Sequence, residues 1–89
     1  MSVKELSGRV ALVTGASAGV GEATARAFAA AGAKVIVAAR GLEKLERVAS
    51  DIGATAITAD VSSEAGCTQL IEQALAVHGR LDVLVNNAG

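Results

Sequence analysis

Residues 10–21 read VALVTGASAGVG, five strand-forming residues followed by a turn that carries Gly15, Gly19 and Gly21. The run Val10–Thr14 is apolar on both faces up to its last residue, which is typical of a strand buried inside a parallel sheet. The turn opens a segment of helical period. A buried strand, a glycine-rich turn and a helix in this order predict the first unit of an α/β fold.

The same alternation of strand and helix patterns continues along the chain. We expect further strands over residues 35–39, 54–59 and 81–86. The intervening helices should end at Gly32, Gly53 and Gly79, because glycine adopts the left-handed conformation that closes a helix. The second helix is expected to begin near Leu42, and Ser62 or Ser63 is expected to cap the third. The expected inner faces are Val20, Thr24, Ala27, Phe28 and Ala31 in the first helix, Leu42, Leu45, Ala49 and Ile52 in the second, and Cys67, Leu70, Ile71, Ala74 and His78 in the third.

This order of elements, β-α-β-α-β-α-β, predicts a partial Rossmann-type fold in three layers, with one domain over residues 1–89. Right-handed crossovers make the expected order of the parallel strands 3-2-1-4. The order reverses between strands one and four, and a ligand of such a sheet binds at the carboxyl ends of the strands beside that point. The glycine-rich turn and residues 86–89 should therefore meet there.

Composition narrows the classes of partner. The 89-residue chain has a formal net charge of −1 with both signs interspersed, so its electrostatics favour neither a nucleic acid nor a membrane surface. Cys67 is the only cysteine, which excludes an internal disulfide and a cysteine-based metal site. No apolar run resembles a signal peptide or a membrane span. We expect a cytoplasmic protein without a bound metal, in which Cys67 is a buried helix residue. His78 is expected in the last turn of its helix, either capping it through the helix dipole or solvated at the surface.

Each glycine of the turn has its own expected function. Gly15 permits the tight turn, Gly19 lets a diphosphate approach the backbone where a Cβ would stand in the way, and Gly21 lets the helix pack closely. The N–H groups at the helix start would then face the phosphates. The alternative is an ordinary turn that happens to be rich in glycine.

The spacing T-G-x-x-x-G-x-G over Thr14 to Gly21 resembles the signature of the short-chain dehydrogenase/reductase family. Asp60-Val61 is similar to the adenine-contacting motif of that family, and residues 86–89 are similar to its N-N-A-G motif. The resemblance implies a dinucleotide cofactor. The residues expected to bind it are Gly15, Ser17, Ala18, Gly19, Val20, Gly21, Arg40, Asp60, Val61, Asn86, Ala88 and Gly89. The alternative is a turn-forming role for Asp60 and for Asn86 with Asn87.

The end of strand two indicates which cofactor is preferred. An acidic residue at this place hydrogen-bonds the adenosine ribose and repels a 2′-phosphate, but here the place is taken by Ala39. Arg40 follows, and its guanidinium can pair with a 2′-phosphate. We therefore expect NADP(H) to be preferred, with NAD(H) as an alternative. A solvated surface arginine is the competing interpretation of Arg40, and Ala18, where many NADP-using relatives are basic, is uncharged.

Catalysis is not expected from these residues. The family uses a serine and a Tyr-x-x-x-Lys pair to transfer hydride between a carbonyl or alcohol and the cofactor, and this chain contains no tyrosine. We expect a cofactor-binding fragment of an oxidoreductase that stops at Gly89, with strand four as an open edge available for self-association or a complementing fragment. The alternatives are a stand-alone module that binds nucleotide without redox chemistry and a methyltransferase that binds S-adenosylmethionine.

Overall fold

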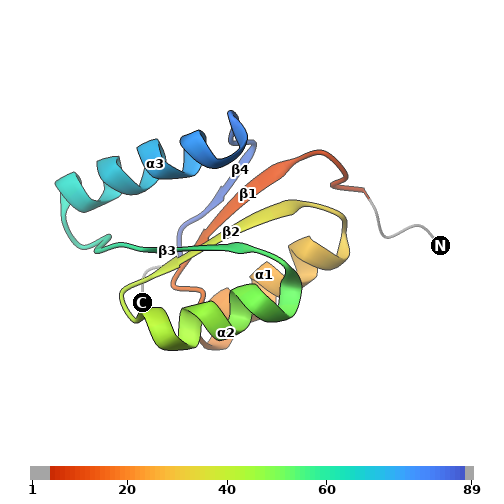
Figure 1. The fold of residues 1–89 in the computed structure, drawn as a ribbon, viewed down its shortest axis with the longest axis horizontal. Coiled ribbons are helices and arrows are strands. Elements are labelled where there is room, and N and C mark those ends of the chain that lie inside the picture. The colour runs from red at the N-terminus through yellow and green to blue at the C-terminus, as the bar shows by residue number, and fades with distance from the viewer. Residues whose placement is uncertain (1–4, 88–89) are drawn as a thin grey trace.

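Four parallel strands form the centre of the computed structural model, which describes residues 5–87. They lie in the order β3-β2-β1-β4, which confirms the predicted topology. The strands are β1 (Val10–Thr14), β2 (Lys34–Ala39), β3 (Thr55–Thr58) and β4 (Val83–Val85). The helices are α1 (Gly19–Ala30), α2 (Leu42–Ile52) and α3 (Glu64–His78). Figure 1 shows α3 on one face of the sheet and α1 with α2 on the other.

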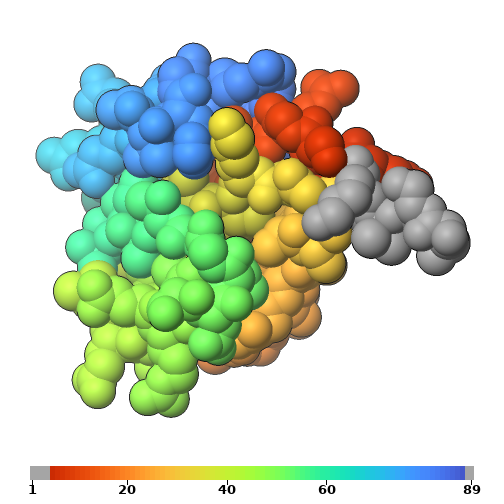
Figure 2. Space-filling view, turned by 45° about the vertical axis from the view of Figure 1, so that its right-hand side comes forward, coloured from red at the N-terminus to blue at the C-terminus, as the bar shows by residue number. Residues whose placement is uncertain are grey.

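Apolar side chains on the two faces of the sheet make two separate cores. Successive strand residues point to opposite faces, so in β1 Leu12 faces α3 while Val13 faces α1 and α2. The core between α3 and the sheet consists of Val10, Leu12, Ile36, Ala38, Ile57, Leu70 and Ala74. The core between the sheet and α1 with α2 consists of Val13, Ala16, Ala25, Val35, Val37, Leu45 and Ala49. In Figure 2 the blue surface of α3 and the light-green surface of α2 accordingly lie on opposite sides of the molecule.

The predicted inner face of α1 was correct at Phe28, which packs against the core, and wrong at Val20 and Ala27. Gly21 and Ala25 are buried instead, whereas Val20 is 72% exposed and Ala27 is also exposed. The cause lies at the start of the helix, where a Cβ on Gly21 would come within 2.1 Å of the Gly15 carbonyl oxygen. Gly21 must therefore face the turn. Val20 precedes it and lies about 100° away around the helix, so Val20 faces solvent.

Two further expectations about burial were wrong. Leu42 is 48% exposed, because at the first residue of α2 it lies beyond the cluster in which Leu45, Val48 and Ala49 are buried. Cys67 is exposed on the first turn of α3, one turn before the buried Leu70, and its thiol lies 3.3 Å from the Val61 carbonyl oxygen.

The helix ends follow the sequence signals. Gly53 (φ +71°) and Gly79 (φ +76°) close α2 and α3 in the left-handed conformation, and Gly32 (φ +93°) follows the end of α1. Of the two candidate caps for α3, Ser63 is the N-cap, and its hydroxyl accepts a hydrogen bond from Gly66 N–H at 3.0 Å. The third and fourth strands are shorter than predicted, Thr55–Thr58 and Val83–Val85.

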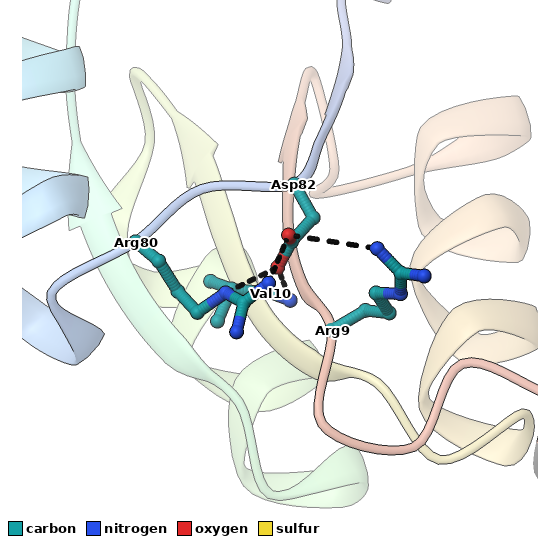
Figure 3. Close-up of polar contacts among 4 residues, drawn as sticks. All are labelled: Arg9, Val10, Arg80 and Asp82. Atoms are coloured by element: carbon teal, nitrogen blue, oxygen red, sulfur yellow. Dashed lines mark hydrogen bonds and ion pairs between the residues drawn. The ribbon is translucent and has the colours of Figure 1, made fainter.

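A carboxylate aligns β4 with β1 at the amino ends of the strands (Figure 3). Asp82 accepts hydrogen bonds from Val10 N–H at 2.8 Å and from Arg80 at 2.6 and 2.9 Å, and Arg9 lies 3.8 Å away. The Arg80 guanidinium, then the Val10 N–H and the charges of Arg80 and Arg9, lower the pKa of Asp82. The Asp82 side chain takes the place of a backbone acceptor for Val10 N–H, and the Asp82 N–H donates to the Val10 carbonyl oxygen at 2.9 Å, so Asp82 joins the two strands just before β4 begins at Val83.

Candidate functional site

A hollow of about 740 Å³ opens beside the carboxyl ends of the strands. Four segments contribute to its wall: the turn after β1, the end of β2, the loop after β3, and Asn87 in the chain after β4. Its lining residues are Gly15, Ser17, Ala18, Val20, Ala38, Ala39, Arg40, Gly41, Ala59, Asp60, Val61, Ser62 and Asn87. The hollow therefore lies at the place where the strand order predicts a ligand.

The first wall of the hollow is the turn between β1 and α1, and close backbone contacts hold it. Gly15 has φ +62°, and a Cβ there would lie 2.3 Å from the Asn87 carbonyl oxygen. A Cβ on Gly21 would meet both the Gly15 carbonyl and the Asn87 side chain. The turn is also fixed to β2 by a hydrogen bond of 3.2 Å from Ala16 N–H to the Ala38 carbonyl. A side chain at either glycine would force these segments apart.

Gly19 differs from the other two glycines because the space beside it is open. Its φ is +62°, and a Cβ built there would meet no atom within 4 Å. Ala18, the N-cap of α1, supplies no side-chain hydrogen bond to the first turn of the helix. The N–H groups at this helix start are consequently available to an anion, which the helix dipole also favours. These residues fit a phosphate group close to the backbone.

The Thr14 hydroxyl joins the ends of β1 and β4 behind this turn. It accepts a hydrogen bond of 2.9 Å from Asn87 N–H and lies 3.1 Å from Asn86 Oδ1 and 3.3 Å from the Val85 carbonyl oxygen. Thr14 is only 3% exposed. Its single hydroxyl thus determines where the chain after β4 enters the site.

Two exposed residues of opposite charge stand on the wall formed by β2 and β3. Arg40 follows β2, and Asp60 is the second residue of the loop after β3. Hydrogen bonds from the Ser62 hydroxyl and backbone N–H lower the pKa of Asp60, and the positive charge of Arg40 lowers it further. Asp60 is therefore a carboxylate near neutral pH. No residue among 5–87 forms an ion pair with Arg40.

The structure brings together most of the residues expected at the site. Gly15, Ser17, Ala18, Val20, Arg40, Asp60 and Val61 line the hollow. Gly19 and Gly21 belong to the same turn, and Asn86 points its side-chain oxygen at Thr14. Ala88 and Gly89 lie outside the described residues. Asp60 also forms the turn that was its alternative role, since Ser62 N–H donates to its Oδ1 at 3.0 Å.

The sequence prediction of the site left out Ser62 and Asn87, and it placed Thr14 in the loop without giving it a contact of its own. Ser62 was considered only as a helix cap, although an aspartate side chain commonly accepts from the backbone N–H two residues on. Asn87 was treated as a turn former and lines the hollow. Within residues 5–87 no group of three or more His, Cys, Asp or Glu side chains is arranged to hold a metal ion, and no helix is long and apolar enough to cross a membrane.

Comparison with known proteins identifies a family. A family model described as short chain dehydrogenase matches residues 9–89. A 3-oxoacyl-(acyl-carrier-protein) reductase of rhamnolipid biosynthesis from Pseudomonas aeruginosa is 46% identical over 88 residues, which cover 94% of this chain and 34% of the relative. The chain thus spans about a third of the length of this curated relative.

Solved structures agree with this match. A Pseudomonas aeruginosa protein described as an NADP active-site complex superposes with a TM-score of 0.90 at 42% identity, covering 99% of this chain and 37% of the other. A 3-ketoacyl-(acyl-carrier-protein) reductase from Brucella melitensis, complexed with NADH, gives a TM-score of 0.91 at 48% identity, covering 96% of this chain and 36% of the other.

Proposed function

The chain belongs to the short-chain dehydrogenase family, and from that premise we propose that it binds NADP(H) in the hollow beside the carboxyl ends of its strands. The observation that carries the proposal is Gly19, which combines a left-handed backbone, open space and an uncapped helix start on the same turn. A diphosphate requires these properties, because its oxygens accept hydrogen bonds from backbone N–H groups at short range. Neighbours solved with NADP and with NADH support a nicotinamide dinucleotide.

The charges on the opposite wall support an orientation for the cofactor. Ser17, Ala18 and Val20 would surround the diphosphate together with the glycines of the turn. The adenosine half would then lie toward Arg40 and Asp60, with Val61 beside the base. The nicotinamide half would extend toward Asn86 and residues 88–89. When bound, the cofactor supplies a hydride donor or acceptor, and the residues of this chain hold and orient it.

Arg40 carries the proposed preference for NADP(H) over NAD(H). Its guanidinium follows Ala39, so no carboxylate closes β2 to repel a 2′-phosphate. Guanidinium and phosphate form charge-assisted hydrogen bonds that the 2′-hydroxyl of NAD(H) cannot match. Asp60 lines the same wall as an ionised carboxylate, and the positive charge of Arg40 also acts on it. We propose that Arg40, for which the residues 5–87 provide no ion-pair partner, binds the additional phosphate.

The family also suggests a function for the whole enzyme of which this chain would be one part. We propose that residues 1–89 are the cofactor-binding portion of an oxidoreductase that exchanges hydride between NADP(H) and a carbonyl or alcohol. The chain has no tyrosine, so it holds no residue for the proton transfer that family members assign to one. Binding of the cofactor, without turnover, is therefore the property to measure on this chain.

The test is a fluorescence titration of the chain with NADPH and with NADH. We expect saturable binding that is tighter for NADPH, and we expect Arg40→Ala to reduce the ratio of the two affinities by roughly tenfold. Arg47→Ala removes the same charge from an exposed position on α2 outside the hollow and should leave the ratio unchanged.

Each part of the proposal has its own contrary result. Absence of saturable binding to a chain that circular dichroism shows to be folded would overturn the proposed site. Binding of NADPH and NADH with equal affinity would retain the site and overturn the preference. An equal loss in the Arg40 and Arg47 variants would assign the effect to net charge and not to the hollow.

A further inference from the structure

Ser62 holds one oxygen of a carboxylate that faces the hollow. Its hydroxyl donates a hydrogen bond of 2.5 Å to Asp60 Oδ1, and its backbone N–H donates a second one of 3.0 Å to the same atom. Both residues line the hollow and both are exposed. Without these bonds, the Asp60 side chain would be free to change rotamer, as an exposed aspartate normally is.

The two bonds leave Asp60 with one oxygen to offer. A carboxylate oxygen has two acceptor sites, and Ser62 occupies both sites of Oδ1. No residue among 5–87 donates a hydrogen bond to Oδ2. A fixed and ionised carboxylate of this kind can only accept, so it distinguishes a ligand edge that carries an amino group from one that carries an oxo group.

We infer that Ser62 is a positioning residue, which holds Asp60 so that the pocket prefers a cofactor with a 6-aminopurine base over one with a 6-oxopurine base. The inference rests on the proposed function and adds a determinant of base selectivity to it. Facing an oxo group, Oδ2 would place two acceptors in contact, which costs the free energy of an unmade hydrogen bond and adds repulsion. Facing an amino group, it accepts a charge-assisted bond.

The neighbouring serine provides a matched control. Ser63 is one residue further along the same loop and is also exposed, but its hydroxyl accepts from Gly66 N–H at 3.0 Å and caps α3. Removing it weakens a helix cap and removes neither of the two hydrogen bonds to the Asp60 carboxylate. Ser63→Ala therefore reports what a general loosening of the loop would do, and Ser62→Ala reports in addition what the loss of the Asp60 contact does.

The experiment compares the affinity of the chain for NADPH with its affinity for reduced nicotinamide hypoxanthine dinucleotide phosphate, which carries an oxo group in place of the adenine amino group. The unmodified chain should prefer NADPH, and Ser62→Ala should reduce that ratio by about twofold to tenfold. Ser62→Thr retains the hydroxyl and should retain the ratio. Ser63→Ala should lower the melting temperature and leave the ratio unchanged.

A pH series supplies a second measurement that a structural role alone would not alter. Protonated Asp60 could donate to an oxo group, so the preference for NADPH disappears when the carboxyl titrates. Because the Ser62 bonds lower the pKa of Asp60, their loss raises it, and the preference of Ser62→Ala should begin to fall at a higher pH than that of the unmodified chain.

The failure of this inference differs from the failure of the proposed function. If the unmodified chain binds neither ligand, the proposed function fails, and the inference fails with it. If it binds NADPH but Ser62→Ala keeps the full ratio, only the inference is overturned. The same holds if Ser63→Ala loses the ratio equally, or if Ser62→Thr loses it as Ser62→Ala does.

Discussion

The hydroxyl of Thr14, at the end of β1, accepts a hydrogen bond of 2.9 Å from the backbone N–H of Asn87, 73 residues later in the chain. This bond lies directly behind the turn that forms the first wall of the hollow. It fixes the chain after β4 against Gly15, whose backbone is already in contact with the Asn87 carbonyl. The pair therefore couples the stability of the β1–β4 contact to the shape of the site.

Thr14→Val tests this coupling. Valine has nearly the same shape as threonine but leaves a buried N–H without its partner, so we expect a loss of about 1–3 kcal/mol in the free energy of unfolding. The affinity for NADPH should fall as well, since Asn87 lines the hollow. Thr14→Ser keeps the hydroxyl and should bind more tightly than Thr14→Val. Urea denaturation and NADPH titration check both, and equal behaviour of the two variants would show that the hydroxyl is not responsible.

Gly15→Ala should cost more stability than Gly53→Ala. Both glycines have a left-handed backbone, with φ +62° and +71°, so both substitutions carry the same conformational penalty, about 1 kcal/mol. A Cβ at Gly53 meets nothing within 4 Å, whereas one at Gly15 would lie 2.3 Å from the Asn87 carbonyl oxygen. The difference between the two urea midpoints therefore measures the destabilisation caused by the clash between the Cβ added in Gly15→Ala and the Asn87 carbonyl oxygen. Equal midpoints would mean that the turn and the chain after β4 separate without cost.

The Asp82 cluster predicts an acid-sensitive contribution to stability. Because Arg80 and the Val10 N–H lower the pKa of Asp82 from its ordinary value of 3.8, the folded state favours the carboxylate. Its contribution is complete above that value and is lost as the pH falls through the lower pKa of the folded state. Asp82→Asn keeps an acceptor for Val10 N–H and removes the charge. The melting temperatures of the two proteins should differ at pH 6 and converge toward pH 2.5, and a difference independent of pH would contradict the prediction.

The free edge of β4 predicts self-association of the chain. In the described sheet β4 pairs only with β1, and Leu84 is 53% exposed. An apolar strand edge of this kind can pair with the same edge of a second copy. We expect the sedimentation coefficient to rise with concentration and Leu84→Lys to abolish the rise. Val20→Lys is the control, because Val20 is 72% exposed on α1, away from that edge. A monomer at every concentration would exclude the association.

The strand order and most of the site could be predicted because they depend on local patterns. Buried strands, helical periods and glycine stops recur along the chain, and right-handed crossovers leave few arrangements of four parallel strands. The same rule places the turn after β1 beside the chain after β4, so Gly15, Arg40 and Asp60 could be assigned to one place before any contact was known.

The tertiary structure decided the contacts that join distant parts of the chain. Periodicity located α1 and its Phe28, but it placed Val20 on the inner face wrongly, since the orientation of the helix depends on Gly21 meeting the Gly15 carbonyl. It could not distinguish the structural role of Ser63 from that of Ser62 beside Asp60. A sequence pattern indicates only the environment that a type of residue usually has at a given position in a helix, strand or turn. The partner of one hydroxyl or carboxylate depends on backbone positions to within a few tenths of an ångström, and those positions exist only once the sheet has formed.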